Sequence, residues 1–149
     1  MTVDEMSTKI LVVDDEPDVL LLCKVNLEFE GYEVAVAPDG ATALEMIADD
    51  PPDLLLLDVM MPGLDGWQVL QRLRDDVEGP QFPVIMLTAK VQEQDQIKGL
   101  SGGAVDYVTK PFNPVGLAKT IQEALEAAAS GDLEIRRERM LDKIKLIQG

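Results

Sequence analysis

The 149-residue chain has no histidine and a single cysteine, Cys23. The absence of histidine removes the commonest metal ligand and the usual general base of enzymes at neutral pH. One cysteine excludes an intramolecular disulfide, and the apolar run that contains Cys23 predicts a buried core thiol rather than a reactive one. Any metal site in this chain is therefore expected to use oxygen ligands.

Basic residues are also few, with 13 Lys and Arg against 28 Asp and Glu and a net charge of −15. This charge opposes binding to nucleic acid, so we expect no direct nucleic-acid contact and a protein or a cation as partner. The first seven residues carry acids where a signal peptide carries positive charge, and no apolar run approaches membrane-spanning length. We therefore expect a soluble cytoplasmic protein without membrane contact.

Short apolar runs recur along the chain between turn residues. The four leucines before Asp58 are typical of a strand that is buried on both faces of a parallel sheet. The expected strands are 9–13, 32–37, 54–58, 83–88 and 105–109. Helices are expected at 17–30, 41–48, 66–74, 91–100 and 114–129, and helical spacing resumes over 133–148.

Alternating strands and helices predict right-handed crossovers and an α/β fold, a doubly wound five-stranded parallel sheet of flavodoxin-like order 2-1-3-4-5. The second strand ends at Ala37 without a reactive side chain, which suits an edge. We expect a frayed N-terminus over residues 1–8, one domain over 9–129 and a C-terminal helical extension over 130–149. The surplus apolar residues Leu21 and Val25 predict deep packing of the first helix, with a partner surface as the alternative.

Polar side chains follow four of the expected strands, and the carboxyl ends of parallel strands share one edge. Asp14 and Asp15 follow the first, Asp58 ends the third, Thr88 ends the fourth and Lys110 follows the fifth. Neighbouring carboxylates repel by about 4 kcal/mol at 4 Å and an effective dielectric constant near 20. Lys110 can offset one charge and a hard divalent cation two more, which favours Mg²⁺, or Mn²⁺ in its place.

A carboxylate beside a cation and an ammonium is a poor base but a competent nucleophile toward phosphorus, and its product is an aspartyl phosphate. Taken singly, these residues have ordinary interpretations. An acidic pair after a strand often caps a helix, a lysine is usually on the surface, and a threonine at a strand end bonds the backbone. Their joint occurrence at four strand ends favours one site.

The segments 9–17, 54–63, 84–89 and 103–112 strongly resemble the receiver domain of two-component response regulators, and the resemblance covers about residues 9–129. It implies Asp58 as the phosphoacceptor. It also implies roles for other residues: magnesium ligands Asp14, Asp15, Asp58 and the backbone carbonyl of Met60; phosphoryl-binding Thr88 and Lys110; a switch aromatic, Tyr107; and a cis peptide bond between Lys110 and Pro111.

The resemblance further implies a signalling protein that catalyses only its own phosphorylation and dephosphorylation. Its partners would be a sensor histidine kinase or phosphotransfer protein and a downstream protein partner or output domain. Phosphorylation would repack the fourth helix, the fifth strand and the fifth helix. Met60 and Lys90 stand where some family members place acids or amides that orient water, so we expect a long-lived acyl phosphate.

Two other functions stay open. A magnesium-dependent phosphohydrolase on a similar sheet typically adds an acid two residues beyond its nucleophile, where this chain has Met60. A receiver-like scaffold that does not take phosphate is disfavoured by the complete set of acids, Thr88 and Lys110. The C-terminal extension has an apolar face and a basic character, so we expect it to pack on the domain, to pair in a homodimer or to act as a linker. That face comprises Leu133, Met140, Ile144 and Ile147.

Overall fold

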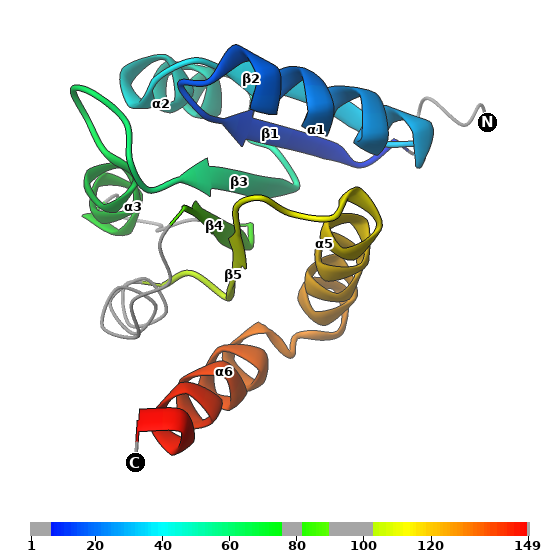
Figure 1. The fold of residues 1–149 in the computed structure, drawn as a ribbon, viewed down its shortest axis with the longest axis vertical. Helices are drawn as coiled ribbons and strands as arrows, with labels where there is room; N and C mark the ends of the chain where they lie inside the picture. The colour runs from blue at the N-terminus through cyan, green and yellow to red at the C-terminus, as the bar shows by residue number, and fades with distance from the viewer. Residues whose placement is uncertain (1–6, 76–81, 90–102, 149) are drawn as a thin grey trace.

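The computed structural model describes residues 7–75, 82–89 and 103–148. Its sheet has five parallel strands in the order β2-β1-β3-β4-β5, which confirms the predicted topology (Figure 1). The strands are β1 (Lys9–Val13), β2 (Glu33–Ala37), β3 (Leu54–Asp58), β4 (Val84–Thr88) and β5 (Asp106–Thr109).

The helices in the described part of the chain are α1 (Pro17–Phe29), α2 (Gly40–Asp49), α3 (Gly66–Asp75), α5 (Pro114–Ser130) and α6 (Leu133–Gln148). The helix expected at 91–100 lies outside the described residues, as does most of the N-terminus expected to fray. Within the described ranges, no helix combines the length and the apolar character needed to cross a membrane.

Alternation along β3 divides the core into two halves, because successive side chains of a strand point to opposite faces. Leu54 and Leu56 pack into the half that α1 and α5 cover, whereas Leu55 and Leu57 pack into the half that α2 and α3 cover. Figure 1 shows these two helix pairs on opposite sides of the sheet. All four leucines are fully buried, which confirms a central strand.

A capping box fixes the start of α3 close to the end of β3. The backbone amide of Gln68 donates to Asp65 Oδ1 at 2.9 Å, and the backbone amide of Asp65 donates to Gln68 Oε1 at 3.0 Å. These reciprocal bonds satisfy two amides that the first turn of a helix leaves without partners. The loop after β3 is therefore held at both ends, by the sheet and by the cap.

The predicted deep packing of α1 is wrong for its surplus apolar residues. Leu21 is 62% exposed and Val25 is 57% exposed, whereas Cys23 and Leu27 are fully buried. At about 100° per residue, Leu21 and Val25 lie on the side of the helix opposite to Cys23 and Leu27. One stripe of α1 therefore supplies the core, whereas Leu21 and Val25 face away from it.

Leu27 and Leu21 provide a matched pair on one helix. Leu27→Ala is expected to lower the free energy of unfolding by about 2–5 kcal/mol, because it leaves a cavity beside the sheet. Leu21→Ala is expected to change it by no more than about 0.5 kcal/mol, because that side chain is mostly exposed. Urea denaturation followed by circular dichroism measures both, and equal losses would contradict the described orientation of α1.

Candidate functional site

The register of the sheet brings the ends of β1 and β3 together. Val13 pairs with Leu57, so Asp14 and Asp58 follow at neighbouring positions of adjacent strands. Asp14 is fully buried and Asp58 is 2% exposed. Asp53, in contrast, accepts a hydrogen bond from the backbone amide of Lys9 at the amino end of the sheet, and it takes no part in this site.

Lys110 places its ammonium group between these two buried carboxylates. Its Nζ lies 2.6 Å from Asp14 Oδ2 and 3.3 Å from Asp58 Oδ1. Its backbone amide donates to the carbonyl of Thr88 at 2.8 Å, which joins the end of β5 to the end of β4. The peptide bond between Lys110 and Pro111 is cis. The structure thus brings Asp14, Asp58 and Lys110 into direct contact.

The charges at this site are out of balance, because one ammonium faces two buried carboxylates. Burial and the nearby charge of Asp14 raise the pKa of Asp58 to about 7, although Lys110 and the backbone amide of Met60 act in the opposite direction. Burial alone would lower the pKa of Lys110, but its contacts with Asp14 and Asp58 outweigh burial and raise it. Without a further cation, Asp58 therefore holds its proton far more readily than an exposed aspartate.

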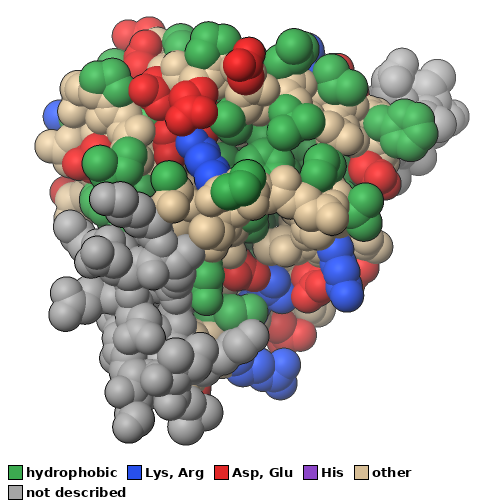
Figure 2. All heavy atoms as spheres, in the orientation of Figure 1, with side chains coloured by type: hydrophobic (Ala, Val, Ile, Leu, Met, Phe, Trp, Pro, Cys, Tyr) green, Lys and Arg blue, Asp and Glu red, His purple; other side chains and the backbone are tan. Residues whose placement is uncertain are grey.

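A cluster of oxygen ligands stands next to the ion pair. Asp14, Asp15 and Glu16 each offer one carboxylate oxygen, and these oxygens all lie within 4.8 Å of one another. Figure 2 shows acidic side chains gathered in the upper part of the view, with a basic side chain directly beside them. Asp58 Oδ2 is buried and accepts no hydrogen bond from the described residues. Such donors fit a hard divalent cation.

Glu16 is a site residue that the sequence interpretation did not assign. Its Oε1 lies 3.8 Å from Lys110 Nζ, and its backbone amide donates to Asp14 Oδ1 at 2.9 Å. The acidic run of three residues was the available signal, but the start of α1 at Pro17 also gives an acid there an ordinary helix-terminal interpretation. Asp58 is not a member of the three-carboxylate group, although it meets the same ammonium.

Thr88 and Tyr107 belong to the other face of the sheet. Val84 and Met86 pack into the α2–α3 half of the core, so alternation places Thr88 on the same face. Tyr107 pairs with Met86 across β4 and β5, is half-buried and packs against that half. Thr88 itself is buried. The predicted switch pair therefore shares one face, whereas Asp14, Asp58 and Lys110 follow strand positions of the opposite face.

The loop after Asp58 combines one exposed and one tightly enclosed residue. The side chain of Met60 is 73% exposed and offers no acid or amide. The backbone amide of Gly66 donates to the carbonyl of Val59 at 2.9 Å, and a Cβ at Gly66 would collide with the carbonyl oxygen of Asp58. Glycine at this position therefore lets α3 begin directly against the end of β3, a constraint the sequence interpretation did not identify.

Comparison with known proteins agrees with this geometry. Residues 10–122 match the family model for the response regulator receiver domain. The chain is 44% identical over 123 residues to the response regulator GtcR of Aneurinibacillus migulanus, which covers 83% of this chain and 50% of that protein. It is 47% identical over 109 residues to the alkaline phosphatase synthesis transcriptional regulatory protein PhoP of Bacillus subtilis, covering 73% of this chain and 45% of that protein.

Solved structures of receiver domain proteins superpose on this chain. The CheY-like receiver domain protein of Methanospirillum hungatei superposes with a TM-score of 0.78 at 32% identity, covering 84% of this chain and 98% of that one. The chemotaxis protein CheY4 of Vibrio cholerae gives 0.75 at 32% identity, covering 79% and 98%. The chain belongs to the receiver domain family of two-component response regulators. It spans about half the length of the curated relatives named above.

Receiver domains are signalling domains that interact with histidine kinases and output domains, and they bind Mg²⁺ at an acidic pocket. The acidic cluster at the carboxyl edge of this sheet is consistent with such a pocket. Membership of this family is consistent with a described polar site that consists mainly of acids and one lysine.

The raised pKa of Asp58 predicts a pH dependence of stability in protein freed of divalent cations. Between pH 4 and about 7, folded Asp58 keeps a proton that the unfolded chain releases, so the free energy of unfolding falls as pH rises through this window. Asp58→Asn removes this loss. We expect the variant to be more stable than the parent near pH 8 by about 1–3 kcal/mol, because the gain from removing a buried charge is partly offset by the loss of its ion pair with Lys110.

The advantage of Asp58→Asn is expected to shrink toward pH 4, because the carboxyl of the unfolded parent begins to take up a proton as pH approaches its ordinary pKa. Urea denaturation across this range in the presence of a chelator measures it. Asp49→Asn, at an exposed position at the end of α2, makes the same chemical change outside the site and serves as the control. A constant difference between parent and Asp58→Asn at every pH would contradict the assignment.

Proposed function

We propose that this chain is a phosphorylation-activated switch in which Asp58 accepts a phosphoryl group from a histidine kinase or phosphotransfer protein in the cytoplasm. The observation that carries the proposal is the ammonium of Lys110 between Asp14 and Asp58, at 2.6 and 3.3 Å from their oxygens. An ammonium beside the acceptor can stabilise the charge that develops on a phosphoryl oxygen. The acceptor side chain lies at the carboxyl edge, where open α/β sheets place their ligand sites.

In the proposed step a carboxylate oxygen of Asp58 attacks phosphorus. The new P–O bond forms as the P–N bond to the donor histidine breaks, and the leaving imidazole keeps the electron pair and takes a proton from solvent. With a small donor such as acetyl phosphate, a P–O bond breaks and acetate leaves. Lys110 is close enough to Asp58 to pair with the product. The reactive form of Asp58 is the carboxylate, so the proton that burial favours must first leave.

Magnesium is the cofactor that this proposal requires. Asp14, Asp15, Asp58 and the backbone carbonyl of Met60 would hold it, and Glu16 stands within the same carboxylate cluster. When bound, the ion supplies positive charge to neutralise the acids and the phosphoryl oxygens. Asp58 Oδ2 is buried and accepts no hydrogen bond from the described residues, which is consistent with a site that binds a further ligand.

The proposed readout passes through Thr88 and Tyr107 to β5 and α5; the segment 91–100, which we expected to share this readout, lies outside the described residues. Phosphorylation adds about two negative charges. If Thr88 moves toward the phosphoryl group, it vacates space on the face of the sheet that Tyr107 shares. Two discrete packings of these side chains would form the switch, and phosphate would bias one of them toward a downstream protein partner or output domain. The chain would catalyse only its own phosphorylation and dephosphorylation.

Incubation with acetyl phosphate and Mg²⁺ tests the proposed acceptor. Intact-mass spectrometry is expected to find one added phosphoryl group on the parent and on Asp53→Asn, and none on Asp58→Asn. Asp53 is a matched control because it directly precedes β3, the strand that Asp58 ends, and so lies at the opposite edge of the sheet. Two outcomes would refute Asp58 as the acceptor: a phosphoryl group on Asp58→Asn, or no phosphoryl group on any of the three proteins.

The exposed Met60 predicts a slow loss of the phosphoryl group in the isolated magnesium-loaded protein. A methionine cannot orient the attacking water, whereas an amide at the same position can. Met60→Gln is therefore expected to accelerate loss about tenfold, less than a general acid or base contributes, because an amide can orient the water but does not take its proton. The decay of the phosphorylated mass with time measures both rates. Complete loss from the parent within seconds would contradict the prediction.

A further inference from the structure

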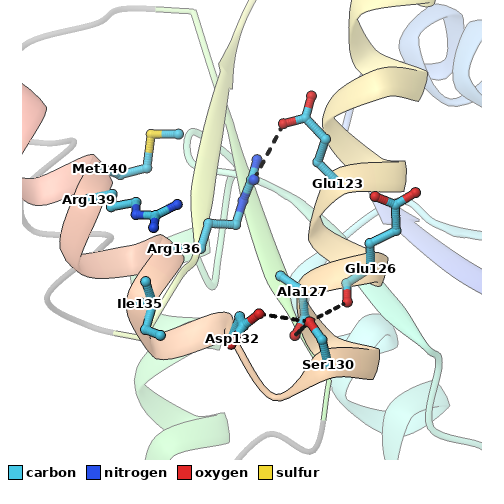
Figure 3. A pocket seen from close by; sticks show the side chains of 9 residues that line it. All are labelled: Glu123, Glu126, Ala127, Ser130, Asp132, Ile135, Arg136, Arg139 and Met140. Atoms are coloured by element: carbon cyan, nitrogen blue, oxygen red, sulfur yellow. Dashed lines mark hydrogen bonds and ion pairs between the residues drawn. The ribbon is translucent and has the colours of Figure 1, made fainter.

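One buried ion pair connects the C-terminal helix to the sheet. Arg136 of α6 places Nη2 at 2.5 Å from Asp106 Oδ2 of β5 and Nη1 at 3.5 Å from Glu123 Oε2 of α5. Figure 3 shows the Arg136 side chain reaching from α6 toward Glu123. Asp106 is only 6% exposed, and burial raises the pKa of its carboxyl although Tyr107 and Arg136 act to lower it.

Asp106 also touches the backbone of the proposed switch residue. Its Oδ1 accepts a hydrogen bond from the backbone amide of Tyr107 at 2.8 Å, while its Oδ2 faces Arg136. One carboxylate therefore bridges α6 and the backbone of Tyr107. Loss of Arg136 would leave a buried charge with a single described donor, which is costly in a protein interior.

The junction between α5 and α6 turns the chain back toward the sheet. Gly131 ends α5 in the left-handed region with φ of +79°, and the backbone amide of Asp132 donates to the carbonyl of Ala127 at 2.7 Å. The next helix then contacts both α5 and β5. Left-handed backbone suits glycine and reverses the chain at a helix end.

The contact between α6 and the domain is narrow. Leu133 packs against the α1–α5 half of the core, but Ile135 is 47% exposed. A cavity of about 510 Å³ separates parts of α5 and α6, and its lining includes the charged side chains Glu126 and Arg139 (Figure 3). The position of α6 therefore depends on Arg136 and the first turn of the helix rather than on a continuous apolar interface.

We infer that α6 is a latch that occupies the β5–α5 face of its own chain through Arg136 and is released when Asp58 is phosphorylated. The inference rests on the proposed function, because the phosphoryl group is the trigger. Asp106 contacts both the backbone amide of Tyr107 and Arg136, so a repacking of Tyr107 that shifts this amide would disturb the contact with Arg136. The latch holds the face against other partners in the unphosphorylated protein, and its release uncovers the buried acidic side chain of Asp106 beside the exposed Glu123.

Hydrogen–deuterium exchange of the full chain tests the latch, read at the amides of residues 133–142. A released helix of this length is marginally stable in water, so its amides should exchange faster. In unphosphorylated protein we expect Arg136→Gln to exchange about tenfold faster than the parent over these residues, within the range of ordinary coupling between two sites. Arg137→Gln is the matched control, because Arg137 pairs with Glu134 of the same helix.

Asp106→Asn gives a second test if Arg136→Gln fails to fold, since it keeps an acceptor for the Tyr107 amide but removes the charge that holds Arg136. It is expected to exchange as fast as Arg136→Gln. Equal exchange in the parent and in a folded Arg136→Gln or Asp106→Asn variant overturns the latch.

The trigger is tested in the same samples with acetyl phosphate and Mg²⁺, and intact mass reports the phosphoryl group. The parent is expected to approach the exchange of Arg136→Gln once it is phosphorylated, and Asp58→Asn is expected to keep the slow exchange. Phosphorylated parent with unchanged exchange overturns the release. Absence of the phosphoryl group from the parent overturns the proposed function and the trigger together, whereas the comparison of unphosphorylated variants still decides whether Arg136 holds the helix.

Discussion

The ammonium of Lys110 is the group on which the site depends, because it is the described cation that separates two buried carboxylates. Lys110 follows β5, whereas Asp14 and Asp58 follow β1 and β3, and β4 lies between them. Its side chain therefore reaches its partners across the end of a strand, and the ion pair can form only when the sheet is assembled. The remaining negative charge explains why Asp58 retains a proton and why the acidic rim suits a cation.

The strands and the residues at the carboxyl edge of the sheet were predictable because both follow short-range rules. A run of four leucines between turn residues specifies a strand buried on both faces, and strand ends of a parallel sheet meet at one edge. Those two rules suffice to bring Asp14, Asp58 and Lys110 together. Pattern alone could not predict which apolar residues of α1 would face away from the core. Leu21 and Val25 are an apolar pair at helical spacing, as are Cys23 and Leu27, and only the second pair is buried.

Contacts between distant segments were outside the reach of the sequence. Asp106 and Arg136 are 30 residues apart, and neither spacing nor composition pairs them. The extension was expected to use an apolar face, and Leu133 of that face does pack against the core, but in the described part of α6 a charged side chain, Arg136, also pairs with Asp106 of β5. Glu16 was hidden for a different reason, since an acid before a helix has an ordinary explanation that competes with a metal-binding one.

The alternation that divides the core along β3 also limits how this family can vary in length. A loop can gain or lose a residue with little effect on the strands it connects. A single insertion between Leu54 and Asp58 would exchange the two faces of everything that follows, and the carboxylate would point into the α2–α3 half, away from Lys110. Insertions or deletions inside β3 that preserve the site must therefore involve an even number of residues, while the turns at either end can change in length.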